Sequence, residues 1–309
     1  MILSEILTIY DLLDKPGRPG KELLKLFKKY KTAKILLQEV KEKKGLTEFI
    51  KIVISGKNGK IKKGKALTLG IIGRLGGIGA RPDIIGFVSD GDGALTVLST
   101  ALRLVRMVKN GDQFEGDIII ATHVCTNAPT TPHDPVPFMG SPVDLTTMNK
   151  YEVDQNMDAI LSVDTSRGNK IINHVGFAIS PTVKEGYILR ISDDLLSIME
   201  QTTGKLPVTF PITTQDITPY GNGLYHFNSI MQPCVATTAP VVGVAITSEV
   251  PVAGCATGAT NAQQIDSVGR FLIEVAQRFS QNKCHFYDKD EYQLILKKYG
   301  SLKSLQKLC

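Results

Sequence analysis

The chain has 309 residues, of which 42% are hydrophobic, so it can bury a large core in one α/β domain or two smaller ones. It has no apolar run near the roughly 20 residues that a membrane-spanning helix needs. Its apolar start, Met1 to Leu7, lacks a basic leader and a small-residue cleavage site. Five scattered cysteines without a Cys-x-x-Cys pair favour free thiols over a zinc ribbon. We therefore expect a cytoplasmic protein without a membrane partner.

The formal net charge of +6 is unevenly distributed. Residues 15–65 contain 17 Lys and Arg against 4 Glu, a local charge of +13, which leaves −7 for the rest of the chain. A basic segment can attract nucleic acid, but this one has few aromatic residues for stacking and no recognisable nucleic-acid motif. A solvated, lysine-rich face explains the segment better, so nucleic acid is not an expected partner.

Hydrophobic periodicity and turn residues predict a basic helix-hairpin segment over residues 1–66. The predicted elements are helices over 1–14 and 20–30 and strands over 35–40 and 49–54. Lys57-Asn58-Gly59 predicts a further hairpin, which leads into a strand over 67–72.

The turn Ser89-Asp90-Gly91-Asp92-Gly93 is the point around which the rest of the chain is arranged. From Ala94 on, apolar residues recur at helical spacing, and predicted strands over 67–72 and 117–122 flank this helix. Strand, loop, helix and strand in this order predict a βαβ crossover, which places its chemistry beyond the carboxyl ends of the strands. Because Asp is a preferred N-cap, helix capping alone is the alternative explanation for Asp90 or Asp92.

A glycine-rich loop, residues 73–83, follows the strand over 67–72. Glycines after a strand can bring backbone amides close to a phosphate. The dinucleotide fingerprint, however, needs a helix that starts inside the motif, and Pro82 intervenes here. We instead interpret Gly76 and Gly77 as a tight backbone passage beside a substrate site, with Arg74 or Arg81 facing an anion.

Residues 123–142 lack periodicity and contain five prolines, which preclude a helix or a central strand. A loop of this length in a compact α/β chain is usually functional or disordered, and its apolar residues predict a packed one. It carries His123, His133 and Asp134, which are candidate acid-base groups. An alternative is Cys125 as a nucleophile with one of these histidines as its base.

The second half of the chain continues the alternation of strands and helices. The predicted strands cover 158–164, 187–191, 207–212 and 240–246, and the predicted helices cover 193–203, 223–231, 260–280 and 288–309. The last helix is a C-terminal tail of a single α/β domain that spans residues 1–309.

Asp90, His123 and Asp164 share one position relative to the predicted sheet. Asp90 precedes the central helix, whereas His123 and Asp164 lie at the carboxyl ends of strands. Two carboxylates and an imidazole suit a divalent metal such as zinc or manganese. His133 and Asp134 are placed to fold over the same edge. The alternative for His123 is a hydrogen-bonded structural residue.

This order of elements resembles the zinc aminopeptidases of the phosphorylase/hydrolase-like fold over roughly residues 1–280. Residues 89–98 resemble the family turn whose Asp bridges two metals, and residues 158–164 resemble the strand that supplies a second-metal carboxylate. The resemblance implies these roles for Asp90 and Asp164. It also implies a three-layer α/β fold with a mixed sheet and helices on both faces, and a homo-oligomer.

The chain departs from that family at other ligand positions. Gly73-Arg74-Leu75 replaces its His-x-Asp, residues 122–127 replace its Glu-Glu pair, and no histidine follows the strand over 240–246. Ordinary two-zinc chemistry is therefore not expected. The remaining residues would bind one metal in an altered site, or none.

Two longer motifs, residues 73–82 and 132–142, are similar to an uncharacterised prokaryotic family described only as a domain of unknown function (DUF1177). That family supplies no activity.

From the resemblance to the zinc aminopeptidases and the residues at the strand ends, we predict a metal-assisted hydrolase that acts on a small amide or peptide-derived substrate. The alternative is a non-catalytic protein that binds a small anion in the same cleft.

Overall fold

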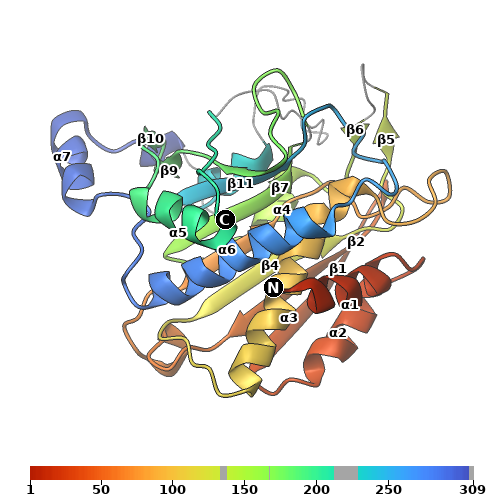
Figure 1. Ribbon diagram of the computed structural model, residues 1–309, viewed down its shortest axis with the longest axis horizontal. Helices are drawn as coiled ribbons and strands as arrows, with labels where there is room; N and C mark the ends of the chain where they lie inside the picture. The colour runs from red at the N-terminus through yellow and green to blue at the C-terminus, as the bar shows by residue number, and fades with distance from the viewer. Residues whose placement is uncertain (133–137, 167, 212–228, 306–309) are drawn as a thin grey trace.

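The computed structural model describes residues 1–132, 138–166, 168–211 and 229–305, and helices and strands alternate along them (Figure 1). The helices are α1 (Leu3–Leu13), α2 (Pro19–Lys28), α3 (Asp92–Lys109), α4 (Leu145–Glu152), α5 (Asp193–Thr203), α6 (Ala262–Ser280) and α7 (Lys289–Tyr299). The strands are β1 (Ala33–Glu42), β2 (Gly45–Ile54), β3 (Leu69–Gly73), β4 (Ile118–Val124), β5 (Thr130–Thr131), β6 (Phe138–Met139), β7 (Ala159–Thr165), β8 (Gly176–Ile179), β9 (Thr182–Lys184), β10 (Tyr187–Leu189) and β11 (Val241–Thr247). Short 3₁₀ helices are η1 (Lys60–Lys62), η2 (Ser89–Gly91), η3 (Ser229–Val235) and η4 (Lys303–Leu305).

One sheet of nine strands organises the chain, in the order β1-β2-β4-β3-β7-β11-β9-β10, with β8 paired to β11. The four central strands, β4, β3, β7 and β11, run parallel, so their carboxyl ends meet at one edge. The strands β1 and β2 extend the sheet in antiparallel fashion. The predicted βαβ crossover is β3, α3 and β4.

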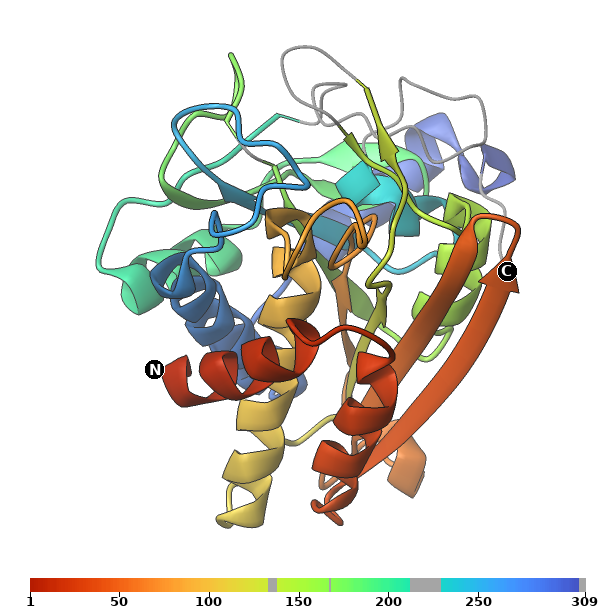
Figure 2. The same cartoon turned by 90° about the vertical axis from the view of Figure 1, so that its right-hand side faces the viewer.

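Helices cover both faces of this sheet, which confirms the three-layer α/β fold (Figure 2). The alternation of β4 shows why: Ile118 and Ile120 pack in the main core with α3 and α6, whereas Ile119 packs in a second core on the other face. The helix α4 and the turn η3 lie on that second face. Because α3 is enclosed by the sheet, α1 and α6, 13 of its 18 residues are buried.

The basic N-terminal segment is part of the main sheet. Helices α1 and α2 and strands β1 and β2 form as predicted, and β2 pairs along its length with β4. The predicted hairpin at Lys57-Asn58-Gly59 is wrong. The buried Asp117 carboxylate accepts the N–H groups of Gly56 and Ile61 at 2.8 and 2.9 Å, and it holds this segment as a loop around η1.

The elements of the second half lie mostly where periodicity predicted them, and α5 has the predicted bounds. The predicted strand over 207–212 does not form among the described residues, where Thr209 makes a single bridge with Ile179. Pro207 and Pro211 explain the difference, because proline has no N–H to donate. The predicted helix over 223–231 lies largely outside the described residues. The tail helix predicted over 288–309 is shorter. The helix α7 ends at Tyr299 and is followed by Gly300, whose φ is +83°.

Among the described residues, no helix combines the length and the apolar character that crossing a membrane requires.

Candidate functional site

The carboxyl ends of β3, β4 and β7 bring together residues that are far apart in sequence. Arg74 directly follows β3, His123 is in β4 and Asp164 is in β7. The backbone N–H of Arg74 donates to the carbonyl of Val163 at 2.7 Å, and the Thr165 hydroxyl donates to the carbonyl of Asp90 at 3.3 Å. The η2 turn and the strand tips are therefore direct neighbours, as the βαβ order predicted.

A fully buried ionic cluster, Arg74–Glu152–His123, lies at this edge. Arg74 Nη1 donates to Glu152 Oε2 at 2.5 Å, and Glu152 Oε1 is 2.5 Å from His123 Nδ1. Arg74 is 1% exposed, and the other two side chains are 0% exposed. Since Glu152 is the last residue of α4, this carboxylate links α4 to β3 and β4.

The electrostatics of the cluster favour the ionised form of Glu152. Burial by itself raises the pKa of a carboxyl, because it removes solvation from the charged form. Here the Arg74 guanidinium, together with His123, outweighs burial and holds the pKa of Glu152 below its ordinary value. The cluster is therefore a buried charge pair with a histidine attached to it.

Stability is expected to depend on pH through this carboxylate. Because the pKa of Glu152 is lower in the folded chain than its ordinary value of 4.5, its stabilising contribution is complete above about pH 4.5. That contribution is lost as the pH falls through the lower, folded value. We expect the difference in the free energy of unfolding between wild type and Glu152→Gln to shrink below about pH 4.5. Urea unfolding at a series of pH values measures it, and a difference constant with pH would contradict the prediction.

Two atoms of the cluster are left over. Arg74 Nη2 and His123 Nε2 are buried and have no hydrogen-bond partner among the described residues. When His123 donates its Nδ1–H to Glu152, its Nε2 presents a lone pair. Buried polar atoms are almost always hydrogen-bonded in native proteins. Each of the two atoms is therefore a position at which a ligand or a water would supply the missing partner.

Glu152 and the helix that carries it were not predicted from the sequence. The helix α4 begins after the N-cap Asp144, whose carboxylate accepts the N–H of Thr147 at 2.7 Å. Leu145, Met148 and Glu152 then fall on its buried side. An Asp followed by apolar residues at helical spacing was the available signal, and it lay directly behind the proline-rich segment.

The two carboxylates of the turn into α3 do not cap the helix. The N-cap is Gly91, without a side-chain cap among the described residues. Asp90 Oδ2 accepts the N–H groups of Gly76 and Gly77 at 2.8 and 3.4 Å, and the buried Asp92 accepts the Thr260 hydroxyl at 2.6 Å. The capping alternative is therefore wrong, and both carboxylates hold tertiary contacts.

The glycine-rich loop makes the tight passage that the sequence predicted. A Cβ on Gly76 would lie 2.6 Å from the carbonyl oxygen of Gly140, and a Cβ on Gly77 would lie 2.4 Å from the Cβ of Ala128. Side chains at these two positions are excluded by the segment that follows β4. Whether Gly76 and Gly77 also contact a substrate stays a prediction.

The two predicted anion-facing arginines are in different places. Arg74 belongs to the buried cluster, whereas Arg81 donates through Nη2 to the carbonyl of Asp14 at the end of α1. Arg81 also lines a separate cavity with Cys125. Burial raises the pKa of the Cys125 thiol to about 11, which works against its role as a nucleophile.

The structure does not assemble the predicted metal site from its described residues. Within these residues, which include Asp90, His123 and Asp164, no group of three or more His, Cys, Asp or Glu side chains could hold a metal ion. Each predicted ligand has another bond: Asp90 with the glycine loop, His123 with Glu152, and Asp164 Oδ1 with the N–H of Thr165 at 2.8 Å. The metal site therefore stays a prediction. His133 and Asp134 lie outside the described residues, so their catalytic roles stay predictions.

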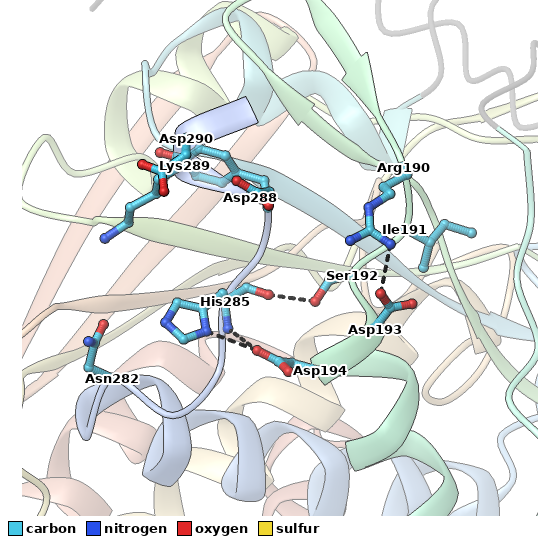
Figure 3. A pocket seen from close by; sticks show the side chains of 11 residues that line it. Arg190, Ile191, Ser192, Asp193, Asp194, Asn282, His285, Asp288, Lys289 and Asp290 are labelled. Carbon is cyan, nitrogen blue, oxygen red and sulfur yellow. Dashed lines mark hydrogen bonds and ion pairs between the residues drawn. The ribbon is translucent and has the colours of Figure 1, made fainter. Parts of the chain in front are cut away.

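A cavity of about 480 Å³ lies elsewhere, between the start of α5 and the α6–α7 connection (Figure 3). Its polar groups bond to one another: His285 Nδ1 lies 3.0 Å from Asp194, and Arg190 donates to Asp193 at 2.7 Å. These four side chains are exposed to solvent. Because these paired charges are exposed to solvent, this cavity has a weaker claim to a ligand than the buried cluster has.

Comparisons with known proteins agree with this fold. The family model described as "Protein of unknown function (DUF1177)" matches residues 38–309. No curated protein matches the sequence. Among solved structures, a mutant of tomato leucine aminopeptidase is similar, with a TM-score of 0.52 and 11% sequence identity. The match covers 88% of this chain and 61% of that one, so this chain spans less than two thirds of its length. At this identity, the likeness shows the fold alone.

Proposed function

The chain belongs to the DUF1177 family, and from that premise, with its aminopeptidase-like fold, we propose that it is a hydrolase of small amide or peptide-derived substrates. The observation that carries the proposal is the buried Arg74–Glu152–His123 cluster with its two unpartnered atoms. In α/β sheets, ligands bind beyond the carboxyl ends of the strands, and this cluster lies there.

His123 is the proposed general base. A carboxylate on Nδ1 orients the imidazole and stabilises it when Nε2 takes a proton, which is the arrangement that histidine bases use in hydrolases. Nε2 would take a proton from the attacking water and return it to the leaving amine. Arg74 Nη2 would bind an anionic oxygen of the substrate, a carboxylate or the oxygen that becomes negative during attack.

Turnover by the purified protein on a panel of dipeptides and small acyl amides tests this proposal. We expect His123→Gln to lower kcat by about 100-fold or more, because Gln can still donate to Glu152 but cannot act as a base. The matched control is His285→Gln, since His285 is also paired with a carboxylate but lies at the exposed cavity. Equal loss in both variants, or no loss in His123→Gln, would refute the assignment.

Binding of a small anion without turnover is the second candidate. It is favoured by the unpartnered Nη2 of Arg74, since a buried guanidinium nitrogen can donate to a carboxylate. A ligand that binds only the folded state adds about 2.7 kcal/mol of stability at 100 times its Kd. Small carboxylates would then raise the melting temperature of wild type but not of Arg74→Gln, and no substrate would be hydrolysed. This result would establish anion binding as the function instead.

The predicted divalent metal is checked in the same preparation by metal analysis of wild type and Asp90→Asn.

A further inference from the structure

A second cavity, of about 420 Å³, lies beside the carboxyl end of β4. Val124 lines it, whereas the preceding residue, His123, faces the opposite side of the sheet, because successive strand residues point to opposite faces. Its walls come from the α1–α2 loop, the start of β2, Arg81–Pro82 and the residues that follow β4. Its volume falls in the range of about 300–1,000 Å³ that is typical of small-molecule sites.

Two charged groups line the cavity, the buried Glu48 and the partly exposed Arg81, and each is held by one atom and has another atom left over. Glu48 is 3% exposed, and its Oε2 accepts the N–H of Gly20 in the first turn of α2 at 2.9 Å. Arg81 Nη2 donates to the carbonyl of Asp14. Glu48 Oε1 and Arg81 Nη1 are buried without a hydrogen-bond partner among the described residues.

Burial raises the pKa of the Glu48 carboxyl, and an ammonium group beside it would favour its ionised form. The ionised Glu48 and Arg81 have opposite charge, and this restricts what they can bind. A simple anion would pair with Arg81 but would also face the unpartnered oxygen of Glu48. A simple cation would meet the converse difficulty with Arg81. A molecule that carries both an ammonium and a carboxylate group offers a partner of opposite charge to each of the two side chains, and charge-assisted hydrogen bonds of this kind are among the strongest in proteins.

We propose that this cavity is a binding site for a free α-amino acid, whose ammonium group bonds to Glu48 and whose carboxylate bonds to Arg81. The remaining walls include Pro16, Leu46 and Val124, so they suit an apolar side chain. Arg18 at the rim is already paired with Glu39 at 3.0 Å. Cys125, which keeps its proton because burial raises its pKa to about 11, adds no charge. The site is separate from the proposed catalytic centre and does not depend on it.

Calorimetric titration with three probes of similar shape tests the assignment. The probes are L-leucine, L-leucinamide, which lacks the carboxylate, and isocaproate, which lacks the ammonium group. We expect saturable binding of L-leucine and at least about tenfold weaker binding of the other two, because each leaves either Glu48 or Arg81 without its charged partner. Equal affinity for all three, or no saturable binding of leucine at concentrations on the order of 10 mM, would overturn the proposal.

Variants locate the site. Glu48→Gln keeps an oxygen for the N–H of Gly20 but removes the charge, and Arg81→Gln removes the guanidinium; each is expected to weaken leucine binding at least about tenfold. Because Arg81→Gln also removes the bond to Asp14, Leu46→Trp provides a test that touches no polar group and fills the cavity. Arg190→Gln at the exposed cavity is the control and should leave the affinity unchanged. Unchanged affinity in folded Glu48→Gln and Leu46→Trp would refute the proposal.

Discussion

Replacement of Glu152 by Gln is expected to lower the free energy of unfolding by about 3–5 kcal/mol, the range found when one partner of a buried ion pair is removed. The reason is that Arg74, at 1% exposure, keeps its charge but loses the carboxylate that compensates it. His123 loses the acceptor of its ring proton at the same time. Urea unfolding near neutral pH, followed by circular dichroism, measures the change.

The matched control is Glu274→Gln on α6. Glu274 also pairs with an arginine, Arg278, at 2.6 Å, but both side chains are about 30% exposed. An exposed pair at this spacing contributes about 0.3–0.5 kcal/mol, so the control should differ little from wild type. A loss of unfolding free energy below about 1 kcal/mol in Glu152→Gln would contradict the prediction, because it would mean that water or another group pairs with Arg74.

Replacement of Gly93 by Ala is expected to destabilise the fold by about 3 kcal/mol, in the upper part of the range for overpacking. Gly93 lies in the first turn of α3, where it faces the tips of β3 and β7. An added Cβ would lie 2.6 Å from the carbonyl oxygen of Arg74 and 2.9 Å from that of Val163. The Val163 oxygen belongs to the backbone of β7 and the Arg74 oxygen to the residue directly after β3, and backbone at these positions cannot move aside cheaply. This contact outweighs the roughly 1 kcal/mol by which helix propensity favours Ala.

Thermal or urea unfolding of Gly93→Ala measures the effect, and Gly254→Ala is its control. A Cβ on Gly254 would meet its nearest atoms, in Met139 and Asp90, at 3.4 and 3.6 Å, which are ordinary contact distances. We expect the control to remain within about 0.5 kcal/mol of wild type. A stabilised Gly93→Ala would mean that α3 can shift away from the strand tips.

Local sequence signals were sufficient for most helices and strands. The helix α5 has its predicted bounds because local residues set both of its ends. The Ser192 side chain accepts the N–H of Leu195 in the first turn, and Gly204 adopts a left-handed conformation after the last residue. The parallel centre of the sheet followed from short apolar runs that alternate with helical periodicity. The same local reading failed at Lys57-Asn58-Gly59, where the carboxylate of Asp117, about sixty residues further along, decides the conformation.

The candidate site divides in the same way. The sequence by itself determined that Arg74, His123 and Asp164 lie at or directly after the carboxyl ends of strands and that Asp90 lies in the turn into the central helix, because strand direction and crossover order follow from periodicity. Only the tertiary structure decided which of them interact. It joined Arg74 and His123 through Glu152, directed Asp90 to the glycine loop, and placed Arg81 and Glu48 in the lining of another cavity. The physical reason is that a charge removed from water must find its partner in space, and pairing at distances near 3 Å depends on how whole elements pack, which no local spacing encodes.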